Sequence, residues 1–549
     1  MHTTNLLTFL FFLGVSSGKN ILIFNPIFGF SHVKFISLMA DIIADHGHNV
    51  TLFQPFHNAM KNTEGLVKNK NVEIINYYPD HYEELEKLET ETFPGFWDSH
   101  LMNNPVLQAF MMPRSLVLQF ERTAAQLLKD QKTLDELRSK KFDVVISETF
   151  EITGFCKNSK YFYPNSLNNF SDIAHLLELP CIPIMSAVRF TTFNELFGQP
   201  SSLGYLPAIG SNMAPEAGLF DRINDVFRNF LMLSCMERMS DLQQTFIENA
   251  IGRPVPHWRD LIKQSPIYIT NSNPYLDFAV PTTATIVHVG GITMDLKQMK
   301  HVGKLPEEYV PILNERESTV LISFGSVIRS FQMPDNFKAG LIKMFQSLPD
   351  VTFIWKYEKD DVELKNKLPK NVHLKKWVPQ PALLADKRVK VFVTHGGLGS
   401  TMEVAYSGKP ALMIPIFGDQ PWNAVMLARH GGAIAYDKFD LQDGEKLTRT
   451  MKAMITNPKY QEKAQELLEI LSNQPIDPKL NLMKHLEFAM QFPNLRSQIP
   501  AINQVGIIAH YYLDAIAFIA IFAVLSVYGT YIIICKLPIR LVSKKVKSE

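Results

Sequence analysis

Short apolar runs alternate with amphipathic stretches along most of this chain. The strand-like runs of the first half are NILIFNP, NVTLF, FDVVIS, CIPIM and IYITNS, and the stretch VKFISLMADIIADHG has helical periodicity. Strands that alternate with helices predict a parallel sheet covered on both faces. The second half restarts the alternation with TVLISFG, VTFIWKY, VHLKKW, VKVFVTH, PALMIPIF and GAIAY, and TRTMKAMITNPKYQEKAQELLEIL is expected to form its closing helix.

Two such halves predict an α/β protein with two doubly wound domains that face one another across a cleft. The chain of 549 residues is also too long for one ordinary core. We expect an N-terminal domain over residues 19–278, a linker over 279–291 and a C-terminal domain over 292–500. In such sheets ligands bind beyond the carboxyl ends of the strands.

Both ends of the chain carry apolar segments outside this alternation. Residues 1–18 have an apolar core followed by small residues, which is the pattern of a secretory signal peptide, although no Lys or Arg precedes the core. A short buried helix is the alternative interpretation. Residues 515–535 contain no charged side chain. Because about 20 apolar residues span a bilayer, this segment predicts one transmembrane helix.

The basic tail over residues 536–549 determines the expected topology. Basic residues beside a membrane span stay on the cytosolic side, so we expect a single-pass type I protein with both domains in the lumen. Lys545 and Lys547 resemble the dilysine signal that retrieves membrane proteins to the endoplasmic reticulum, and an ordinary basic flank is the alternative.

A lumenal location gives meaning to two further features. Asn49 and Asn169 are in glycosylation sequons. The lumen also allows a pair to oxidise among Cys156, Cys181 and Cys235, although the sequence does not identify the pair.

The charge balance argues against one class of partner. The net charge is +1, from 55 basic and 54 acidic side chains, and no basic stripe with interleaved aromatic residues is present. Nucleic-acid binding is therefore not expected.

The stretch THGGLGST (394–401) places a histidine and three glycines where a strand turns into a helix that we expect to begin near Ser400. A helix N-terminus offers free N–H groups and a positive dipole end, and both favour a phosphate. Gly396, Gly397 and Gly399 let the backbone approach such a ligand closely. His395 adds a further hydrogen-bond donor. Alone, a glycine-rich turn of this kind is often only a tight connection.

Neighbouring motifs supply partners for the rest of a nucleotide sugar. SFGS (323–326) is a second small-residue turn that ends in Ser326. Trp377 and Gln380 offer an aromatic face and an amide to a base, and Glu403 offers a carboxylate to a ribose. Asp419 and Gln420 can bind sugar hydroxyls. Each residue alone has an ordinary structural explanation, but together they indicate a nucleotide-sugar site.

The stretch WVPQPALLADKRVKVFVTHGGLGSTMEVAYSGKPALMIPIFGDQPWNA (377–424) resembles the signature of the UDP-glycosyltransferases. The resemblance is to the membrane-anchored animal group that contains the UDP-glucuronosyltransferases, and it covers nearly the whole chain. It implies a GT-B fold with two Rossmann-like domains, a C-terminal UDP-sugar site and an N-terminal site for a lipophilic acceptor. It also implies inverting transfer without a metal or other cofactor, and no Asp-x-Asp motif is present.

The resemblance also assigns roles to the residues of the donor site. It implies that Trp377 stacks on uracil, Gln380 reads its edge and Glu403 binds the ribose. The diphosphate is assigned to Ser326, His395 and Ser400, with the backbone at Gly397 and Gly399, and the sugar to Asp419 and Gln420. Relatives often carry Asn at the position of Gly399, so backbone is expected to replace that side chain here.

The resemblance places the catalytic base at His32, in NPIFGFSHVKF. Imidazole is suited to take a proton from an acceptor hydroxyl at neutral pH. A carboxylate behind it would orient the ring. The family usually supplies Asp after the strand FDVVIS, and here the candidate is Glu148, whose extra methylene alters its reach. Glu151 is the competing carboxylate.

The expected function is transfer of a sugar from a UDP-sugar to small lipophilic acceptors, which includes detoxification chemistry. Glucuronate is favoured as the sugar, and glucose is the rival. Two other classes remain open: a catalytically inactive relative that binds UDP-sugar or lipid, and a membrane-anchored partner that regulates other transferases. Segments rich in Phe and Met are assigned to the acceptor site only as a group, and the sequence is compatible with a homo- or hetero-oligomer.

Overall fold

The computed structural model describes residues 18–57, 63, 65–84, 95–98, 120–154, 179–200, 206–208, 211, 217–252, 254–294, 305–326, 328–493, 495, 507–510 and 512–536. The chain forms two compact units, Met1–Arg496 and Ser497–Glu549. Residues 1–17 of the predicted signal peptide, Cys156, Asn169 and nearly all of the basic tail lie outside the described residues.

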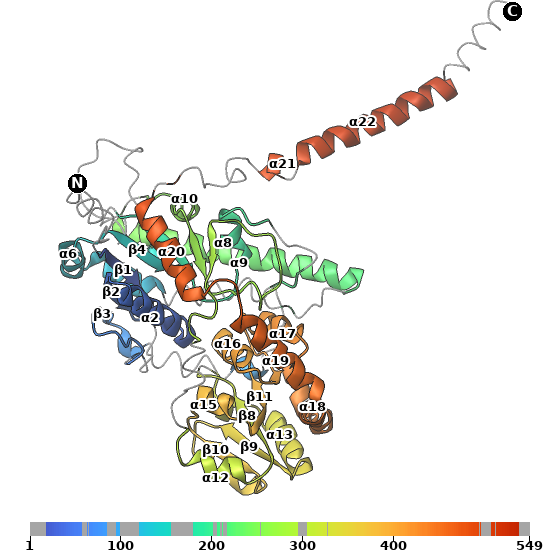
Figure 1. Ribbon diagram of the computed structural model, residues 1–549. Coiled ribbons are helices and arrows are strands. Elements are labelled where there is room, and N and C mark those ends of the chain that lie inside the picture. Colours follow the sequence, from blue (N-terminus) through green and yellow to red (C-terminus); the bar gives the residue numbers. More distant parts are fainter. Residues whose placement is uncertain are drawn as a thin grey trace, which may run out of the picture. The chain divides into compact units, whose positions relative to one another are not determined.

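The first half of the large unit contains a seven-stranded parallel sheet in the order β3-β2-β1-β4-β5-β6-β7 (Figure 1). Its strands are β1 (Asn20–Phe24), β2 (Asn49–Pro55), β3 (Val72–Tyr77), β4 (Val144–Glu148), β5 (Cys181–Met185), β6 (Tyr268–Thr270) and β7 (Ile286–His288). The longer helices of this half are α2 (Phe30–Asp45), α6 (Gln131–Ser139), α8 (Thr191–Leu196), α9 (Leu219–Ile251) and α10 (Trp258–Lys263).

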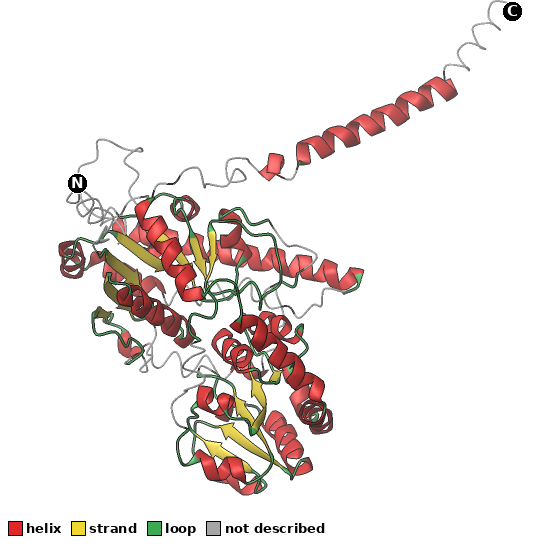
Figure 2. Ribbon diagram, in the orientation of Figure 1, coloured by secondary structure: helices red, strands yellow, loops and turns green. Residues whose placement is uncertain are grey.

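The second half contains a six-stranded sheet in the order β10-β9-β8-β11-β12-β13, and helices flank both sheets (Figure 2). Its strands are β8 (Ser318–Ser323), β9 (Val351–Lys356), β10 (Val372–Lys375), β11 (Val389–Thr394), β12 (Ala411–Met413) and β13 (Ala433–Ala435). Its helices are α12 (Tyr309–Asn314), α13 (Asp335–Ser347), α14 (Val362–Lys367), α15 (Gln380–Ala385), α16 (Leu398–Ser407), α17 (Gln420–Ala428), α18 (Gly444–Thr456), α19 (Pro458–Ser472) and α20 (Pro478–Gln491).

The strand order reverses once in each sheet, and this reversal positions the candidate site. In the first sheet β1 lies between β2 and β4, and in the second β8 lies between β9 and β11. Connections leave a doubly wound sheet in opposite directions at such a point, which opens a space beyond the strand ends. The loops after β1, β4, β8 and β11 carry His32, Glu148, Ser326 and His395, either in the loop or at its border.

Two strands differ from the expectation. The segment expected to be a linker contributes β7, which pairs with β6 in parallel and forms an edge of the first sheet. The other edge strand, β3, is not predicted from the sequence. Several of its side chains are exposed at the edge of the sheet, so the strand has no strong apolar pattern.

Two helical features also differ. The expected closing helix is divided into α18 and α19 at Asn457, because Pro458 has no backbone N–H with which to continue α18. The following helix, α20, packs on the first sheet: Leu482, Met483 and Leu486 belong to the same buried cluster as β1. Asn481 Nδ2 also donates to the backbone oxygen of His288, at 2.9 Å. The last helix of the large unit therefore returns to the N-terminal half.

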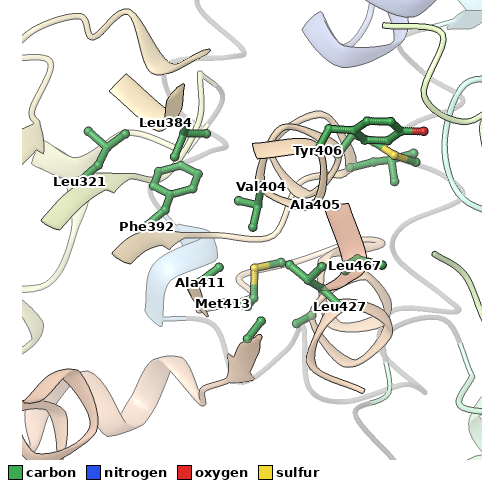
Figure 3. Close-up of a cluster of buried hydrophobic side chains, with 14 of the residues drawn as sticks. Leu321, Leu384, Phe392, Val404, Ala405, Tyr406, Ala411, Met413, Leu427 and Leu467 are labelled. Carbon is green, nitrogen blue, oxygen red and sulfur yellow. The ribbon is translucent and has the colours of Figure 1, made fainter. Parts of the chain in front are cut away.

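A buried cluster holds the helix that follows β11 (Figure 3). Val404, Ala405 and Tyr406 of α16 belong to this cluster together with Phe392 and Met413 of the sheet. Packing of one side of α16 leaves its first turn, with Gly399 and Ser400, only partly buried. The core thus fixes the helix and leaves its N-terminus available to a ligand.

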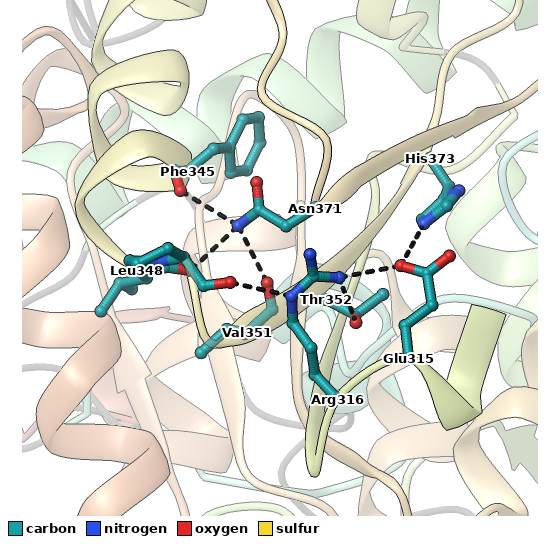
Figure 4. Close-up of polar contacts among 9 residues, drawn as sticks. Glu315, Arg316, Phe345, Leu348, Val351, Thr352, Asn371 and His373 are labelled. Atoms are coloured by element: carbon teal, nitrogen blue, oxygen red, sulfur yellow. Dashed lines mark hydrogen bonds and ion pairs between the residues drawn. The ribbon is translucent and has the colours of Figure 1, made fainter.

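Polar contacts fasten the opposite, amino end of the second sheet (Figure 4). Asn371 Nδ2 lies 3.1, 2.9 and 2.9 Å from the backbone oxygens of Phe345, Leu348 and Val351. Arg316 Nε donates to the backbone oxygen of Pro349 at 2.8 Å. These contacts are far along the strands from the candidate site, so they serve the fold.

The one sequon within the described residues lies at the start of β2. Asn49 is exposed, and its side-chain nitrogen donates to Asn20 Oδ1 at 2.9 Å. Thr51 of the same sequon is buried and donates to Glu73 Oε2 at 3.1 Å. Glycosylation at Asn49 stays a prediction.

The small unit contains α21 (Ile507–His510) and α22 (Leu513–Tyr531). Within the part of the chain that the structure describes, one helical stretch, Leu513–Ile534, is long and apolar enough to cross a membrane, with a mean hydropathy of 2.3. Among the residues that the structure describes, its buried fraction is 0%. It is a candidate transmembrane span, close to the expected range.

Asn371 provides a test of the amino-end contacts. We expect Asn371→Ala to lower the free energy of unfolding by about 1–3 kcal/mol, because buried carbonyl groups lose their donor. Thermal unfolding of the detergent-solubilised full chain measures the loss, with exposed Asn336→Ala as the control. An Asn371→Ala protein as stable as the control variant would contradict this assignment, and UDP affinity should not change.

Candidate active site

The first half of the site is a histidine with a fully buried carboxylate behind it. His32 lies in the first turn of α2, and Glu148 is the last residue of β4. His32 Nδ1 is 3.5 Å from Glu148 Oε2, and the two side chains are 17% and 0% exposed. Since β1 and β4 are neighbours in the sheet, their ends bring these two residues together.

Ser186, which follows β5, bridges the pair. Its hydroxyl is in close contact with both His32 Nδ1 and Glu148 Oε2. A carboxylate only accepts hydrogen bonds, so the hydroxyl donates to Glu148 and accepts from a protonated Nδ1. This arrangement leaves the lone pair on Nε2, the nitrogen that is free to act as a base. Ser186 therefore spans the gap that a direct bond does not close.

The backbone holds Glu148 in place. Its Oε1 accepts from the Thr149 N–H at 2.9 Å, and its Oε2 accepts from the Ser186 N–H at 3.1 Å. The competing carboxylate, Glu151, instead lies 3.8 Å from His57 Nε2. The geometry thus brings Glu148, and not Glu151, to the candidate base.

Two aromatic rings contact the imidazole of His32. The Phe28 and Phe150 rings lie 4.5 and 5.5 Å from the imidazole, centroid to centroid. Phe28 also contacts Phe120, at 5.3 Å. An apolar acceptor can pack on these rings with its hydroxyl directed at Nε2.

The second half of the site is built on the turn between β11 and α16. The helix begins at Leu398, two residues before the expected start, with Gly397 as its N-cap. No side chain caps the first N–H groups, so they remain available to an anion. A Cβ built at Gly399 would meet nothing within 4 Å. There is open space at the helix N-terminus.

His395 lies between two glycines of different turns. A Cβ at Gly325 would lie 2.6 Å from His395 Cε1, and a Cβ at Gly397 would lie 2.8 Å from its Nε2. Gly325 also has a φ of 86°, which side chains other than glycine rarely adopt. Both glycines are therefore needed to seat the imidazole.

The charge near His395 comes from Lys356 at the end of β9. Burial, assisted by the charge of Lys356, lowers the pKa of His395 to about 4. The imidazole is then neutral at pH 7, so its N–H group and not a positive charge is what it offers to an anion. Lys356 Nζ donates to the Gly325 backbone oxygen at 2.5 Å and lies 4.8 Å from the centroid of the Trp377 ring. Lys356 supplies a cation beside the expected diphosphate position.

Trp377 and Ser326 are both open to solvent. The Trp377 side chain is 62% exposed, which leaves its ring available for stacking. Ser326 is exposed in the turn after β8. Both positions suit a ligand that lies across the strand ends.

Glu403, Gln380 and Ser400 form one network. Gln380 Nε2 donates to Glu403 Oε2 at 2.6 Å and to Ser400 Oγ at 3.1 Å. Lys34 of α2 donates to Glu403 Oε1 at 3.2 Å. The carboxylate expected to bind a ribose is thus held by side chains that a ligand can replace.

Asp419 and Gln420 stand at the start of α17. Burial raises the pKa of Asp419, while Asn423, which donates to Asp419 Oδ2 at 3.0 Å, and the charge of His32 oppose this shift. Gln420 Oε1 accepts from the N–H groups of Ile416 and Phe417, at 2.8 and 3.0 Å. Its oxygen shapes the loop, and its amide nitrogen is the group that can donate to a sugar.

Three residues of this site were not found from the sequence. Ser186, Lys356 and Lys34 each lie next to a strand end or in the first turns of a helix, and no short motif marks them. The available signal was positional: polar residues at the carboxyl ends of predicted strands collect at one edge of a parallel sheet.

Comparisons with known proteins agree with this architecture. A family profile described as "UDP-glucoronosyl and UDP-glucosyl transferase" matches residues 21–548. The chain is 29% identical to human (Homo sapiens) UDP-glucuronosyltransferase 3A2 over 507 residues, which cover 89% of this chain and 88% of that protein. It is 22% identical to UDP-glucosyltransferase 2 of Dactylopius coccus over 529 residues, which cover 93% of this chain and 91% of that protein.

A solved structure extends the comparison to the fold. The chain resembles Phytolacca americana UGT2 complexed with UDP-2fluoro-glucose and pterostilbene, with a TM-score of 0.51 at 15% identity. The match covers 86% of this chain and 100% of that chain. Together with the two parallel sheets, it shows the GT-B fold with two Rossmann-like domains that the sequence predicts.

Gly399 at the N-terminus of α16 and Gly325 in the SFGS turn should differ in how well they tolerate substitution by alanine. Gly325→Ala adds a Cβ against His395 at positive φ. If His395 must move to relieve this strain, a cost of about 1–3 kcal/mol for its return corresponds to roughly a 5- to 150-fold loss of UDP affinity. Gly399→Ala enters open space and should keep or raise stability by up to about 1 kcal/mol. Calorimetric titration with UDP and thermal unfolding measure both, and wild-type affinity in Gly325→Ala would refute the role given to that glycine.

Removal of the Ser186 hydroxyl should slow catalysis without loss of donor binding. Ser186→Ala leaves Nδ1 and Glu148 without their bridge, and we expect kcat to fall by roughly 10- to 100-fold. The KM for the donor should stay constant, which distinguishes lost orientation of the base from general damage. Ser147→Ala, at a buried serine of β4, is the matched control. Equal kcat values for the two variants would argue against the bridge.

Proposed function

Since this chain belongs to the family of UDP-glucoronosyl and UDP-glucosyl transferases and is a UDP-glycosyltransferase, we propose that it transfers glucuronic acid to a hydroxyl of small lipophilic acceptors. The transfer inverts the anomeric carbon and uses no metal. The observation that carries this proposal is the bridge from His32 through Ser186 to the buried carboxylate of Glu148.

The base works through Nε2 of His32. This nitrogen takes the proton of the acceptor hydroxyl as the oxygen attacks the anomeric carbon from the side opposite UDP. The new bond between carbon and acceptor oxygen forms while the bond to the diphosphate oxygen breaks, and UDP leaves with that electron pair. The buried charge of Glu148 stabilises the imidazolium through the Ser186 hydroxyl.

The second half of the site stabilises the leaving group. The free N–H groups at the start of α16 and the neutral imidazole of His395 donate hydrogen bonds to the diphosphate. Lys356 contributes a positive charge near the same place. Trp377 stacks on uracil, and Glu403 takes the ribose hydroxyls in exchange for Lys34 and Gln380.

The names of the relatives point to two different donor sugars. The human relative is named a glucuronosyltransferase, whereas the Dactylopius relative is named a glucosyltransferase. The Phytolacca structure was solved with UDP-2fluoro-glucose. We favour UDP-glucuronate on the resemblance to the membrane-anchored animal group, and UDP-glucose is the alternative donor.

We further propose that the protein is a single-pass type I protein of the endoplasmic reticulum membrane, with its catalytic domains in the lumen. The apolar stretch Leu513–Ile534 would form the anchor. The basic tail and the signal-like N-terminus in the sequence support this orientation.

A donor and acceptor panel tests the proposal directly. Microsomes that express the full chain receive phenols and sterols with either UDP-glucuronate or UDP-glucose, and product masses are recorded. We expect glucuronides, at a rate that EDTA does not change. Glucosides alone would transfer the assignment to the alternative donor, and no product despite UDP binding would overturn the enzyme assignment for these acceptors.

His32→Ala tests the base in the same microsomes. We expect loss of transfer by at least about 100-fold with UDP affinity retained, because His32 belongs to the other half of the site. If UDP binding were lost as well, His32 would have a structural role instead.

A further inference from the structure

A second buried histidine and carboxylate lie at the carboxyl ends of the strands of the first sheet, where the candidate base also lies. His57 follows β2, and Glu151 follows β4, so the two residues come from the strands on either side of β1. A backbone hydrogen bond fixes the segment after β2, because the His57 N–H donates to the Ile27 backbone oxygen at 3.0 Å. The pair therefore has a defined place beside the loop that leads to His32.

Neither side chain of this pair is satisfied within the described part of the chain. His57 and Glu151 are 1% and 0% exposed, and His57 Nε2 lies 3.8 Å from Glu151 Oε2, which is beyond hydrogen-bond length. Both ring nitrogens and both carboxylate oxygens are buried without a hydrogen-bond partner. Asn25, the residue after β1, has both amide atoms in the same condition. Unpartnered polar groups thus follow three neighbouring strands.

Such a concentration is unusual, because buried polar groups almost always make hydrogen bonds. The fold itself does not need them, since an apolar set of the same volume would pack without this cost. A polar ligand group that enters the site would restore the missing hydrogen bonds. The location at the carboxyl edge of a doubly wound sheet is where ligands bind.

Aromatic rings connect this pair to the base. The His32 ring contacts Phe28 at 4.5 Å, Phe28 contacts Phe120 at 5.3 Å, and Phe120 contacts the His57 ring at 4.9 Å. Successive ring contacts therefore connect the candidate base to the second polar pair. An acceptor that is polar at both ends and apolar between them matches this sequence of groups.

We infer that His57 and Glu151 form a subsite for a second hydroxyl of the acceptor, at the end opposite the hydroxyl that receives the sugar. This inference rests on the proposed function. A hydroxyl can donate to the Glu151 carboxylate and accept from an imidazole N–H of His57, so it satisfies both partners at once. An acceptor carboxylate is disfavoured there by the charge of Glu151. Two candidate ligands are also too few for a structural metal site.

The test compares acceptors that differ only at the far end. The probes are 4-(ω-hydroxyalkyl)phenols and 4-alkylphenols of equal chain length, from two to six carbons, with the full chain in microsomes and the donor that supports transfer. We expect kcat/KM to favour the hydroxyalkyl probe by roughly 10-fold or more at one chain length. Glu151→Gln and His57→Phe should abolish this preference while turnover of the plain alkylphenol is retained.

His48→Phe is the matched control, because His48 is a buried histidine just before the opposite end of the same strand. It should keep the preference. UDP affinity reports whether each variant is folded, and the isosteric Glu151→Gln decides if His57→Phe fails to fold. An unchanged preference in Glu151→Gln, or none in the wild type, overturns the inference while leaving the transferase proposal intact. Absence of transfer from every probe in the wild type would instead count against the proposed function.

Discussion

The completely buried carboxylate of Glu148 is the group on which the N-terminal half of the candidate site depends. Burial of a charged group is strongly unfavourable unless hydrogen bonds replace its water. For Glu148 these bonds come from the Thr149 and Ser186 N–H groups and the Ser186 hydroxyl. These donors lie just beyond β4 and β5. The charge can therefore be buried only when these two strands are paired. The orientation of His32 follows from that arrangement.

The donor half achieves its chemistry by different means. It depends on backbone N–H groups, glycines and one neutral imidazole, whose pKa is lowered to about 4. A neutral donor binds a diphosphate by direction and not by net charge, so the charge has to come from elsewhere. Lys356, at the end of β9, lies close enough to influence His395. One half therefore holds a buried carboxylate behind the candidate base, and the other holds Lys356 behind a neutral hydrogen-bond donor.

Much of the fold could be predicted from the sequence, because apolar periodicity reports burial on both faces of a parallel sheet. The periodicity failed at the two edges of the first sheet, where β3 and β7 lie, and at Pro458, where a local break divides a helical pattern. The motif residues of the site were accessible because they are close in sequence. Ser186 and Lys356 were not, since their roles arise from the pairing of distant strands, as does the division of Glu148 and Glu151 between two histidines.

Three glutamates near the candidate site differ in how their carboxylates are hydrogen-bonded. One is bonded to fixed groups, one to side chains that a ligand can replace, and one to no group among the described residues. Glu148 is satisfied by groups that the sheet holds in place, which suits the orienting role that we propose for it. Glu403 is satisfied by the side chains of Lys34 and Gln380, and the 40% exposure of the Lys34 side chain suits the exchange with a ribose that we propose. Glu151 has no donor within the described residues. Burial does not distinguish Glu148 from Glu151, because both side chains are completely buried. Their hydrogen bonds do distinguish them, and they set Glu403 apart as well.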